Sequence, residues 1–212
     1  MKSPNAAVAA IADAVTVGNV YDMEDLVTAA LDAGENPKDT LDAMMVGLKT
    51  CGDRFEAGEY FLPELMGAGE AFNAGMEVLA PALAPGDRAS EGTVVLGTVR
   101  GDVHDIGKNL VGFMLESSGF TVVNLGVDVT AEAFAQAVRD HQPQVLGMSG
   151  LLTTTMLGMG DVVEELKRQA LRDQVKVIIG GSPVSEKYAQ EIGADGYGTD
   201  AAQAVKLVRS LL

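Results

Sequence analysis

Residues 93–107 read TVVLGTVRGDVHDIG, and this stretch decides the fold class. A β-branched run is followed by a polar turn and then by a helical pattern, and the same succession recurs to the C-terminus. The expected strands are Thr93–Val99, Thr121–Leu125, Val145–Ser149, Val175–Ile179 and a short one at Gly196-Tyr197. The expected helices are about Ile106–Ser118, Ala131–His141, Thr155–Leu171, Ser185–Ile192 and Ala201–Leu212. Such alternation predicts an α/β fold with a five-stranded parallel sheet covered on both faces, in the flavodoxin-like (Rossmann-type) strand order 2-1-3-4-5.

The N-terminal part has a purely helical pattern. Pro-containing starts and Gly stops predict four helices joined by short connections, which form a four-helix bundle. They cover about Ser3–Val17, Val20–Ala33, Asn36–Phe55 and Leu62–Ala84. The sequence therefore predicts two domains, a helical domain over 1–88 and an α/β domain over 89–212, with a candidate hinge around Pro85–Ser90.

Composition excludes several classes of function. With 30 acidic and 15 basic residues the net charge is −15, which argues against nucleic-acid partners and against an anionic membrane surface. A single cysteine, Cys51, excludes an internal disulfide and suits a reducing cytoplasm. No apolar run has the length of a membrane span. We expect an acidic cytoplasmic protein, with Cys51 as a small buried side chain in a helix.

In an open α/β sheet, ligands bind beyond the carboxyl ends of the strands, at the point where strand order reverses. The loops expected there are rich in Gly, Ser and Thr, and neither a GxGxxG nor a GxxxxGK[ST] motif follows the first strand. Candidate ligand contacts in these loops include Val103, Asp105, Ile106, Tyr197 and Gly198.

His104 carries the clearest chemistry of the first loop. It follows a carboxylate, Asp102, by two residues, and Gly107 leaves room for a bulky ligand. One Cys and two His cannot close a zinc site. Two interpretations remain open. The first is an Asp-His general base, for which Ser149 and Thr155 are candidate nucleophiles by position only. The second is a cofactor that brings its own metal and needs one axial imidazole. Lys108, at the start of the next helix, is expected to be solvated.

At these residues the chain resembles the cobalamin-binding domains of methionine synthase and the small corrinoid proteins of methyltransferase systems. Asp102, His104 and Gly107 match the family's DxHxxG motif, Ser149 and Leu151 its SxL motif, and Gly180-Gly181 its GG pair. Residues 53–65, DRFEAGEYFLPEL, are similar to the turn of the family's helical cap domain. The likeness covers nearly the whole chain.

The resemblance implies a base-off, His-on cobalamin (methylcobalamin or a related corrinoid) with His104 as the lower axial ligand of cobalt. Asp102 stands behind His104, and Thr155 holds the position of the serine that completes the relay in methionine synthase. The cofactor's nucleotide tail is expected beside Ser149, Leu151, Thr153 and Gly180-Gly181. The same match places Phe55, Leu62 and Leu65 over the upper face of the corrin.

The resemblance also implies a function. The chain would be a methyl carrier, not catalytic alone, whose cobalt alternates between Co(I) and methyl-Co(III). A substrate-specific methyltransferase would load it, a second methyltransferase would pass the methyl group to tetrahydrofolate or coenzyme M, and a reductive activase would restore it. Two alternatives are a B12-dependent regulator or light sensor, which normally carries a DNA-binding domain, and the small subunit of an adenosylcobalamin mutase, which generally lacks the helical cap.

Overall fold

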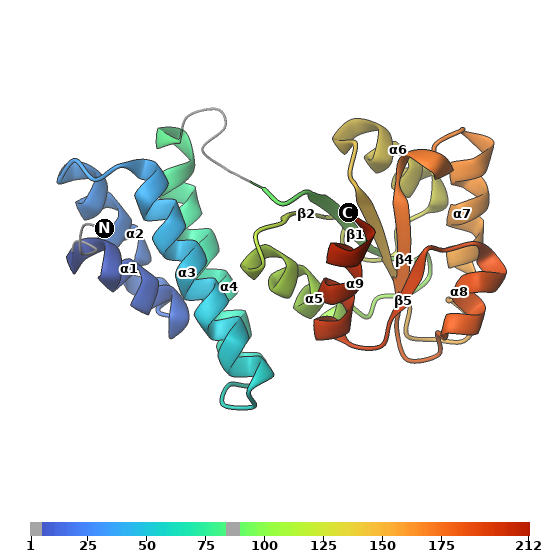
Figure 1. Cartoon of the computed structure of the whole chain (residues 1–212), viewed down its shortest axis with the longest axis horizontal. Coiled ribbons are helices and arrows are strands. Elements are labelled where there is room, and N and C mark those ends of the chain that lie inside the picture. Colours follow the sequence, from blue (N-terminus) through green and yellow to red (C-terminus); the bar gives the residue numbers. More distant parts are fainter. Residues whose placement is uncertain (1–5, 84–89) are drawn as a thin grey trace. The chain divides into compact units, whose positions relative to one another are not determined.

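The computed structural model describes residues 6–83 and 90–212, which fall into two compact units, Met1–Ala89 and Ser90–Leu212 (Figure 1). The predicted helix start at Ser3-Pro4, the predicted domain boundary at 88/89, and most of the candidate hinge lie outside the described residues.

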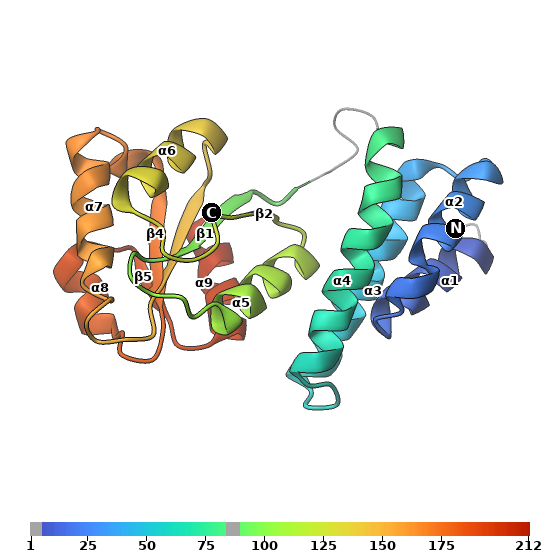
Figure 2. The same ribbon diagram turned by 180° about the vertical axis from the view of Figure 1, so that it is seen from behind.

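The first unit is a bundle of helices. Its elements are α1 (Ala6–Thr16), α2 (Val20–Asp32), α3 (Pro37–Glu56), α4 (Leu62–Leu79) and a 3₁₀ turn, η1 (Ala80–Ala82). Helix α1 packs against α2 and α3, and α4 packs against α2 and α3 (Figure 2). Asn36 caps α3 by accepting a 2.9 Å hydrogen bond from the Lys38 N–H, with Pro37 in the first turn. Helix α4 ends at Leu79, earlier than predicted, because the chain tightens into the 3₁₀ turn around Pro81.

Cys51 is fully buried in α3, as predicted. Burial, helped by the charge of Glu64, raises the pKa of its thiol to about 11. Because the thiolate is the reactive form, we expect Cys51 to resist iodoacetamide at pH 8 in the native protein and to react readily in urea. Mass spectrometry of both samples measures this. Rapid labelling of the native protein would contradict the buried position.

The second unit alternates strands and helices. The strands are β1 (Thr93–Thr98), β2 (Thr121–Asn124), β3 (Val145–Ser149), β4 (Lys176–Gly180) and β5 (Gly196–Gly198). The helical elements are α5 (Ile106–Ser117), α6 (Ala131–His141), α7 (Gly158–Arg168), η2 (Arg172–Gln174), α8 (Glu186–Ile192) and α9 (Ala201–Leu211). All strand pairs are parallel, in the order β2-β1-β3-β4-β5, which confirms the predicted fold class and strand order.

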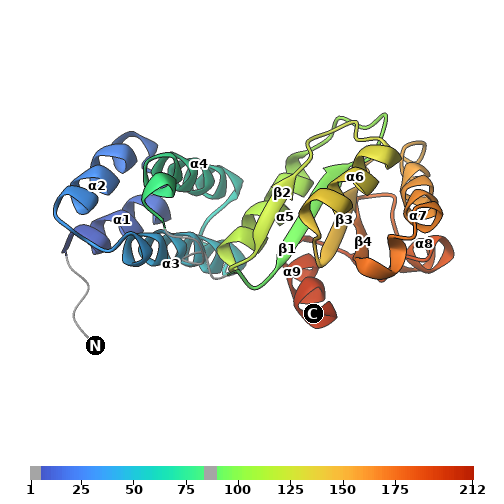
Figure 3. The same cartoon turned by 90° about the horizontal axis from the view of Figure 1, so that it is seen from above.

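Helices cover both faces of this sheet. Helices α5 and α9 lie side by side on one face, and α6, α7 and α8 cover the other (Figures 1 and 3). On the latter face Phe134 is fully buried over Gly97, where an added Cβ would lie 2.6 Å from the ring. The absence of a side chain at Gly97 therefore lets α6 approach β1 closely.

One predicted helix boundary is wrong in a way that bears on function. Helix α7 begins at Gly158 and not at Thr155. The Thr155 and Met156 N–H groups instead donate to the carbonyl of Leu152, at 3.2 and 3.0 Å, and form a turn. Thr155 is thereby held in a loop at the carboxyl edge of the sheet.

No helix among the described residues is both long and apolar enough to cross a membrane.

Candidate functional site

The loops that leave β1, β3, β4 and β5 meet at the carboxyl edge of the sheet. Thr98 at the end of β1 pairs with Ser149 at the end of β3, and Ser149 in turn pairs with Gly180 at the end of β4. A cavity of about 740 Å³ opens there and runs between the sheet and helices α5 and α9. It lies at the predicted position, where strand order reverses between β1 and β3.

His104 projects from the β1–α5 loop on a fixed backbone. Its N–H donates to Asp102 Oδ1 at 3.0 Å, and its carbonyl accepts from the buried Thr98 hydroxyl at 3.0 Å. Its ring Nδ1 lies 2.7 Å from Asp102 Oδ1. With the Asp102 carboxylate ionised, Nδ1 carries the proton and Nε2 keeps its lone pair. The side chain is 48% exposed. Asp102 therefore orients the imidazole on its Nδ1 side, and the remainder of the ring is accessible.

Asp102 is a fully buried carboxylate with its partners in place. Its Oδ2 accepts from the Thr155 hydroxyl at 2.7 Å and from the Leu151 N–H at 2.7 Å. Burial alone would raise the pKa of Asp102, but the hydrogen bonds from Thr155, His104 and Leu151 hold it well below its usual range. The group therefore stays ionised and favours the Nδ1-protonated form of His104 at neutral pH.

The turn before Asp102 is locked by Asp128, from the loop after β2. Asp128 Oδ1 accepts from the Gly101 N–H at 2.7 Å, and the Asp128 N–H donates to the Asp102 carbonyl at 3.0 Å. Gly101 adopts φ +80° and Asp128 itself φ +55°, a region that most residues avoid. The two hydrogen bonds of Asp128, one to each of Gly101 and Asp102, fix where Asp102 enters the site.

Glycines give the cavity its depth. At Gly181, with φ +130°, an added Cβ would lie 1.9 Å from the carbonyl oxygen of Gly150, so the β3 and β4 loops touch backbone to backbone. At Gly107 an added Cβ would meet nothing within 4 Å, which leaves open space beside His104. Val103 and Ile106, on either side of His104, are 70% and 67% exposed. Exposed apolar side chains around an oriented imidazole suit a large ligand with an apolar face.

The structure brings most of the predicted loop residues together. Those that line the cavity are Val103, His104, Asp105, Ile106, Gly107, Ser149, Leu151, Gly180, Gly181, Tyr197 and Gly198. Asp102 and Thr155 stand behind His104. Thr153 is exposed and does not line the cavity.

The three predicted residues of the helical unit differ in burial. Leu65 is buried in the bundle with 1% exposure, whereas Phe55 and Leu62 are half-buried. The neighbouring Phe61 and Met66 are exposed. Leu65 therefore has its main role in the packing of α4, and Phe55 and Leu62 keep part of their surface available.

The prediction that Lys108 is solvated is wrong. Its side chain lies at the cavity with 4% exposure, and its ammonium donates to the Asn109 and Asn124 side chains. Sequence reasoning also missed the floor of the cavity, since hydrophobic strand and helix residues carry no motif. The floor is formed by Leu96, Leu110, Val111, Gly147, Ile178 and Ala204.

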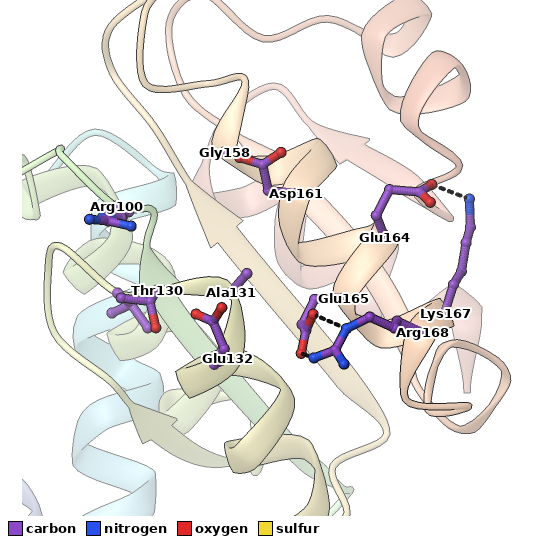
Figure 4. Close-up of a pocket in the computed structure, with 11 residues that line it drawn as sticks. Arg100, Thr130, Ala131, Glu132, Gly158, Asp161, Glu164, Glu165, Lys167 and Arg168 are labelled. Atoms are coloured by element: carbon purple, nitrogen blue, oxygen red, sulfur yellow. Dashed lines mark hydrogen bonds and ion pairs between the residues drawn. The ribbon is translucent and has the colours of Figure 1, made fainter.

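A second cavity of about 590 Å³ lies between α6 and α7, on the other face of the sheet (Figure 4). Its acidic and basic side chains partly neutralise one another, because Glu164 pairs with Lys167 at 2.8 Å and Glu165 pairs with Arg168 at 2.5 Å (Figure 4). It contains no imidazole, so the cavity at His104 remains the candidate site.

Comparisons with known proteins match both parts of the chain to cobalamin-binding families. Residues 92–206 match a family model described as B12 binding domain, and residues 7–80 match a second model of the same description. Trimethylamine corrinoid protein 1 of Methanosarcina acetivorans is 40% identical over 215 residues, with 100% of both chains covered. A corrinoid protein of Desulfitobacterium hafniense is 39% identical over 203 residues, 94% of each chain.

Solved structures give the same result. One chain of the methanol:cobalamin methyltransferase complex MtaBC from Methanosarcina barkeri superposes with a TM-score of 0.88 at 33% identity, over 99% of this chain and 80% of that one. A cobalamin-binding protein from Desulfitobacterium hafniense superposes with a TM-score of 0.67 at 37% identity, over 97% and 98% of the two chains.

The α/β unit with its imidazole-bearing cavity, together with the helical unit, defines a cobalamin-binding protein. The chain belongs to the family of corrinoid proteins of methyltransferase systems. The helical and the α/β parts of the chain are thus each matched by a B12 binding domain model.

Proposed function

We propose that this chain is a methyl-carrier subunit that binds cobalamin base-off, with His104 Nε2 as the lower axial ligand. The observation that carries the proposal is the His104–Asp102–Thr155 arrangement, with contacts of 2.7 Å between His104 and Asp102 and 2.7 Å between Asp102 and Thr155. Hydrogen bonding of Nδ1 to a carboxylate fixes the tautomer and raises the basicity of Nε2 as a ligand. When bound, cobalamin supplies the cobalt atom on which the methyl group travels.

The other residues of the cavity suit the rest of the cofactor. Val103 and Ile106 offer apolar contact to the lower face of the corrin around His104. The glycine contact between the β3 and β4 loops and the apolar floor beneath it leave a slot for the nucleotide tail. Phe55 and Leu62 of the helical unit are proposed to cover the upper face.

The proposed partners are enzymes of a methyltransferase system. A substrate-specific methyltransferase is proposed to load the carrier, as the methanol:cobalamin methyltransferase complex illustrates for its own corrinoid chain. A second methyltransferase, using tetrahydrofolate or coenzyme M, is proposed as the acceptor, and a reductive activase as the repair partner. Relatives named for trimethylamine, dimethylamine and monomethylamine are each 40% identical to this chain. We therefore propose a methylamine as the class of donor, with the choice among amines made by the loading enzyme.

The test is the visible spectrum of the apoprotein reconstituted with methylcobalamin, compared between the native chain and His104→Ala. The native chain is expected to keep the corrinoid through gel filtration and to show a base-off spectrum with imidazole bound to cobalt. The variant is expected to lose the signature of the imidazole ligand. A corrinoid that separates from the native chain during filtration would refute the proposal, and so would identical spectra. The Asp-His pair would then have to be examined as acid–base machinery.

A further inference from the structure

Lys108 is buried although it carries a charge. Among the described residues it is the one Lys or Arg whose side chain is almost completely shielded from solvent, with 4% exposure. Burying an ammonium group is costly unless hydrogen bonds compensate for the lost water. A lysine retained in this position therefore needs a structural or functional reason.

The compensation comes from two neutral amides. Lys108 Nζ donates to Asn109 Oδ1 at 2.6 Å and to Asn124 Oδ1 at 2.7 Å. Burial lowers the pKa of Lys108, and the nearby charge of Asp105 opposes this effect. Among the described residues, no carboxylate lies within ion-pair distance of the ammonium. The interaction is therefore a set of directional hydrogen bonds from a charged donor, which are stronger than those between neutral groups.

These bonds connect two elements of the site. Asn109 Nδ2 donates to Asp105 Oδ2 at 3.0 Å, which extends the network to the residue directly after His104. Asn124, at the end of the edge strand β2, also accepts from the Gly126 N–H at 3.0 Å. Asn124 Nδ2 also donates directly to Asn109 Oδ1 at 3.2 Å. The ammonium, together with this amide contact, ties the first turn of α5 to the end of β2. Asp102 and Thr155 hold His104 from the side of β1 and β3, and the Lys108 network holds the same loop from the side of β2.

We propose that Lys108 is a positioning residue that clamps the first turn of α5 against β2 and thereby keeps His104 in the place from which it reaches cobalt. The inference rests on the proposed function, because it takes His104 as the cobalt ligand. Methionine has a similar length and no charge, so Lys108→Met removes both hydrogen bonds from the ammonium while filling the same space.

The first measurement uses the apoprotein and needs no cofactor. Hydrogen exchange of the peptide covering 103–109 is expected to be at least about tenfold faster in Lys108→Met, because opening this turn no longer breaks bonds from a charged donor. Lys206→Met is the matched control, since Lys206 is exposed on α9 and its substitution changes the net charge equally. Exchange in the control is expected to equal that of the native chain.

The second measurement uses the chain reconstituted with methylcobalamin. The fraction of cobalt that carries the imidazole ligand, read from the visible spectrum at pH 7, is expected to fall in Lys108→Met and to stay at the native level in Lys206→Met. Asn109→Ala provides a second variant that tests the clamp even if Lys108→Met fails to fold. Asn109 is exposed, and its loss removes the link to Asp105 and the bonds that Asn109 accepts from Lys108 and Asn124. The bond between Lys108 and Asn124 remains.

The outcomes separate this inference from the proposed function. If the native chain itself lacks the imidazole-bound spectrum, the proposed function fails. If the native chain shows that spectrum and both Lys108→Met and Asn109→Ala show it undiminished, the clamp is refuted and the function stands. A fall in thermal stability with an unchanged spectrum would also refute it, because Lys108 would then serve the fold alone.

Discussion

Gly181→Ala is expected to abolish corrinoid binding and to lower the stability of the α/β unit by roughly 3–5 kcal/mol. An alanine Cβ at this position would lie 1.9 Å from the Gly150 carbonyl oxygen, so the β3 and β4 loops would have to separate. The backbone at Gly181 also has φ +130°, which side-chain-bearing residues rarely adopt. Because both loops line the cavity, their separation would change the slot proposed for the nucleotide tail. Thermal unfolding of the apoprotein and retention of methylcobalamin through gel filtration measure the two effects.

Gly126→Ala is the matched control for that experiment. Gly126 also has a positive φ, +81°, but an added Cβ there meets nothing within 4 Å. Gly126→Ala therefore introduces backbone strain of about 1–2 kcal/mol without a collision between the new Cβ and neighbouring atoms. We expect a modest loss of stability and near-native corrinoid retention. Equal effects of the two substitutions would show that strain, and not the contact between the loops, dominates at Gly181.

Asp102→Ala is expected to remove the imidazole-bound spectrum and to cost about 3 kcal/mol of stability, because the donors around this buried carboxylate lose their acceptor. The substitution leaves the Leu151 N–H and the Thr155 hydroxyl without their 2.7 Å partner, and it frees the His104 ring to rotate. Nothing would then hold the Nδ1-protonated tautomer. The measurement is again the spectrum of the reconstituted chain, together with urea unfolding of the apoprotein.

The control for Asp102 is Asp161→Ala. Asp161 is an exposed carboxylate on α7, so its removal changes the charge equally without exposing buried donors. Stability and spectrum are expected to remain native. Thr155→Val is expected to give an intermediate result, because it removes one donor to Asp102 and keeps the shape of the side chain. A native imidazole-bound spectrum in Asp102→Ala would contradict the idea that this carboxylate orients His104.

The sequence predicted most of the fold because its signals are local. Runs of β-branched residues mark the strands, and their strict alternation with amphipathic segments leaves few strand orders to consider. The same locality explains the error at α7. Thr155 belongs to a helical pattern in sequence, yet the carbonyl of Leu152 captures its N–H in a turn. The Thr155 hydroxyl also donates to the carboxylate of Asp102, which is distant in sequence. The spacing of hydrophobic residues gives no sign of this contact.

The predicted site residues came from a motif, and the residues that were missed lack one. His104, Asp102 and Gly107 stand at fixed spacing within one loop. Lys108 follows Gly107 directly, but its burial depends on Asn124, which is 16 residues away in sequence, at the end of strand β2. A charged residue at the start of a helix is ordinarily solvated, and only tertiary packing overturns that expectation here.

The Asp102 carboxylate accepts hydrogen bonds from its own loop after β1 and from the loop after β3. This arrangement affects how the site works. The Leu151 N–H and the Thr155 hydroxyl stay on the carboxylate whether or not the imidazole is in place. The His104 main chain is likewise held apart from its ring, through its own N–H and through Thr98. Of these contacts, only the one between His104 Nδ1 and Asp102 Oδ1 depends on the position of the imidazole ring. Rotation of the His104 ring about its side-chain bonds therefore leaves the main chain of His104 and the hydrogen bonds from Leu151 and Thr155 to Asp102 intact.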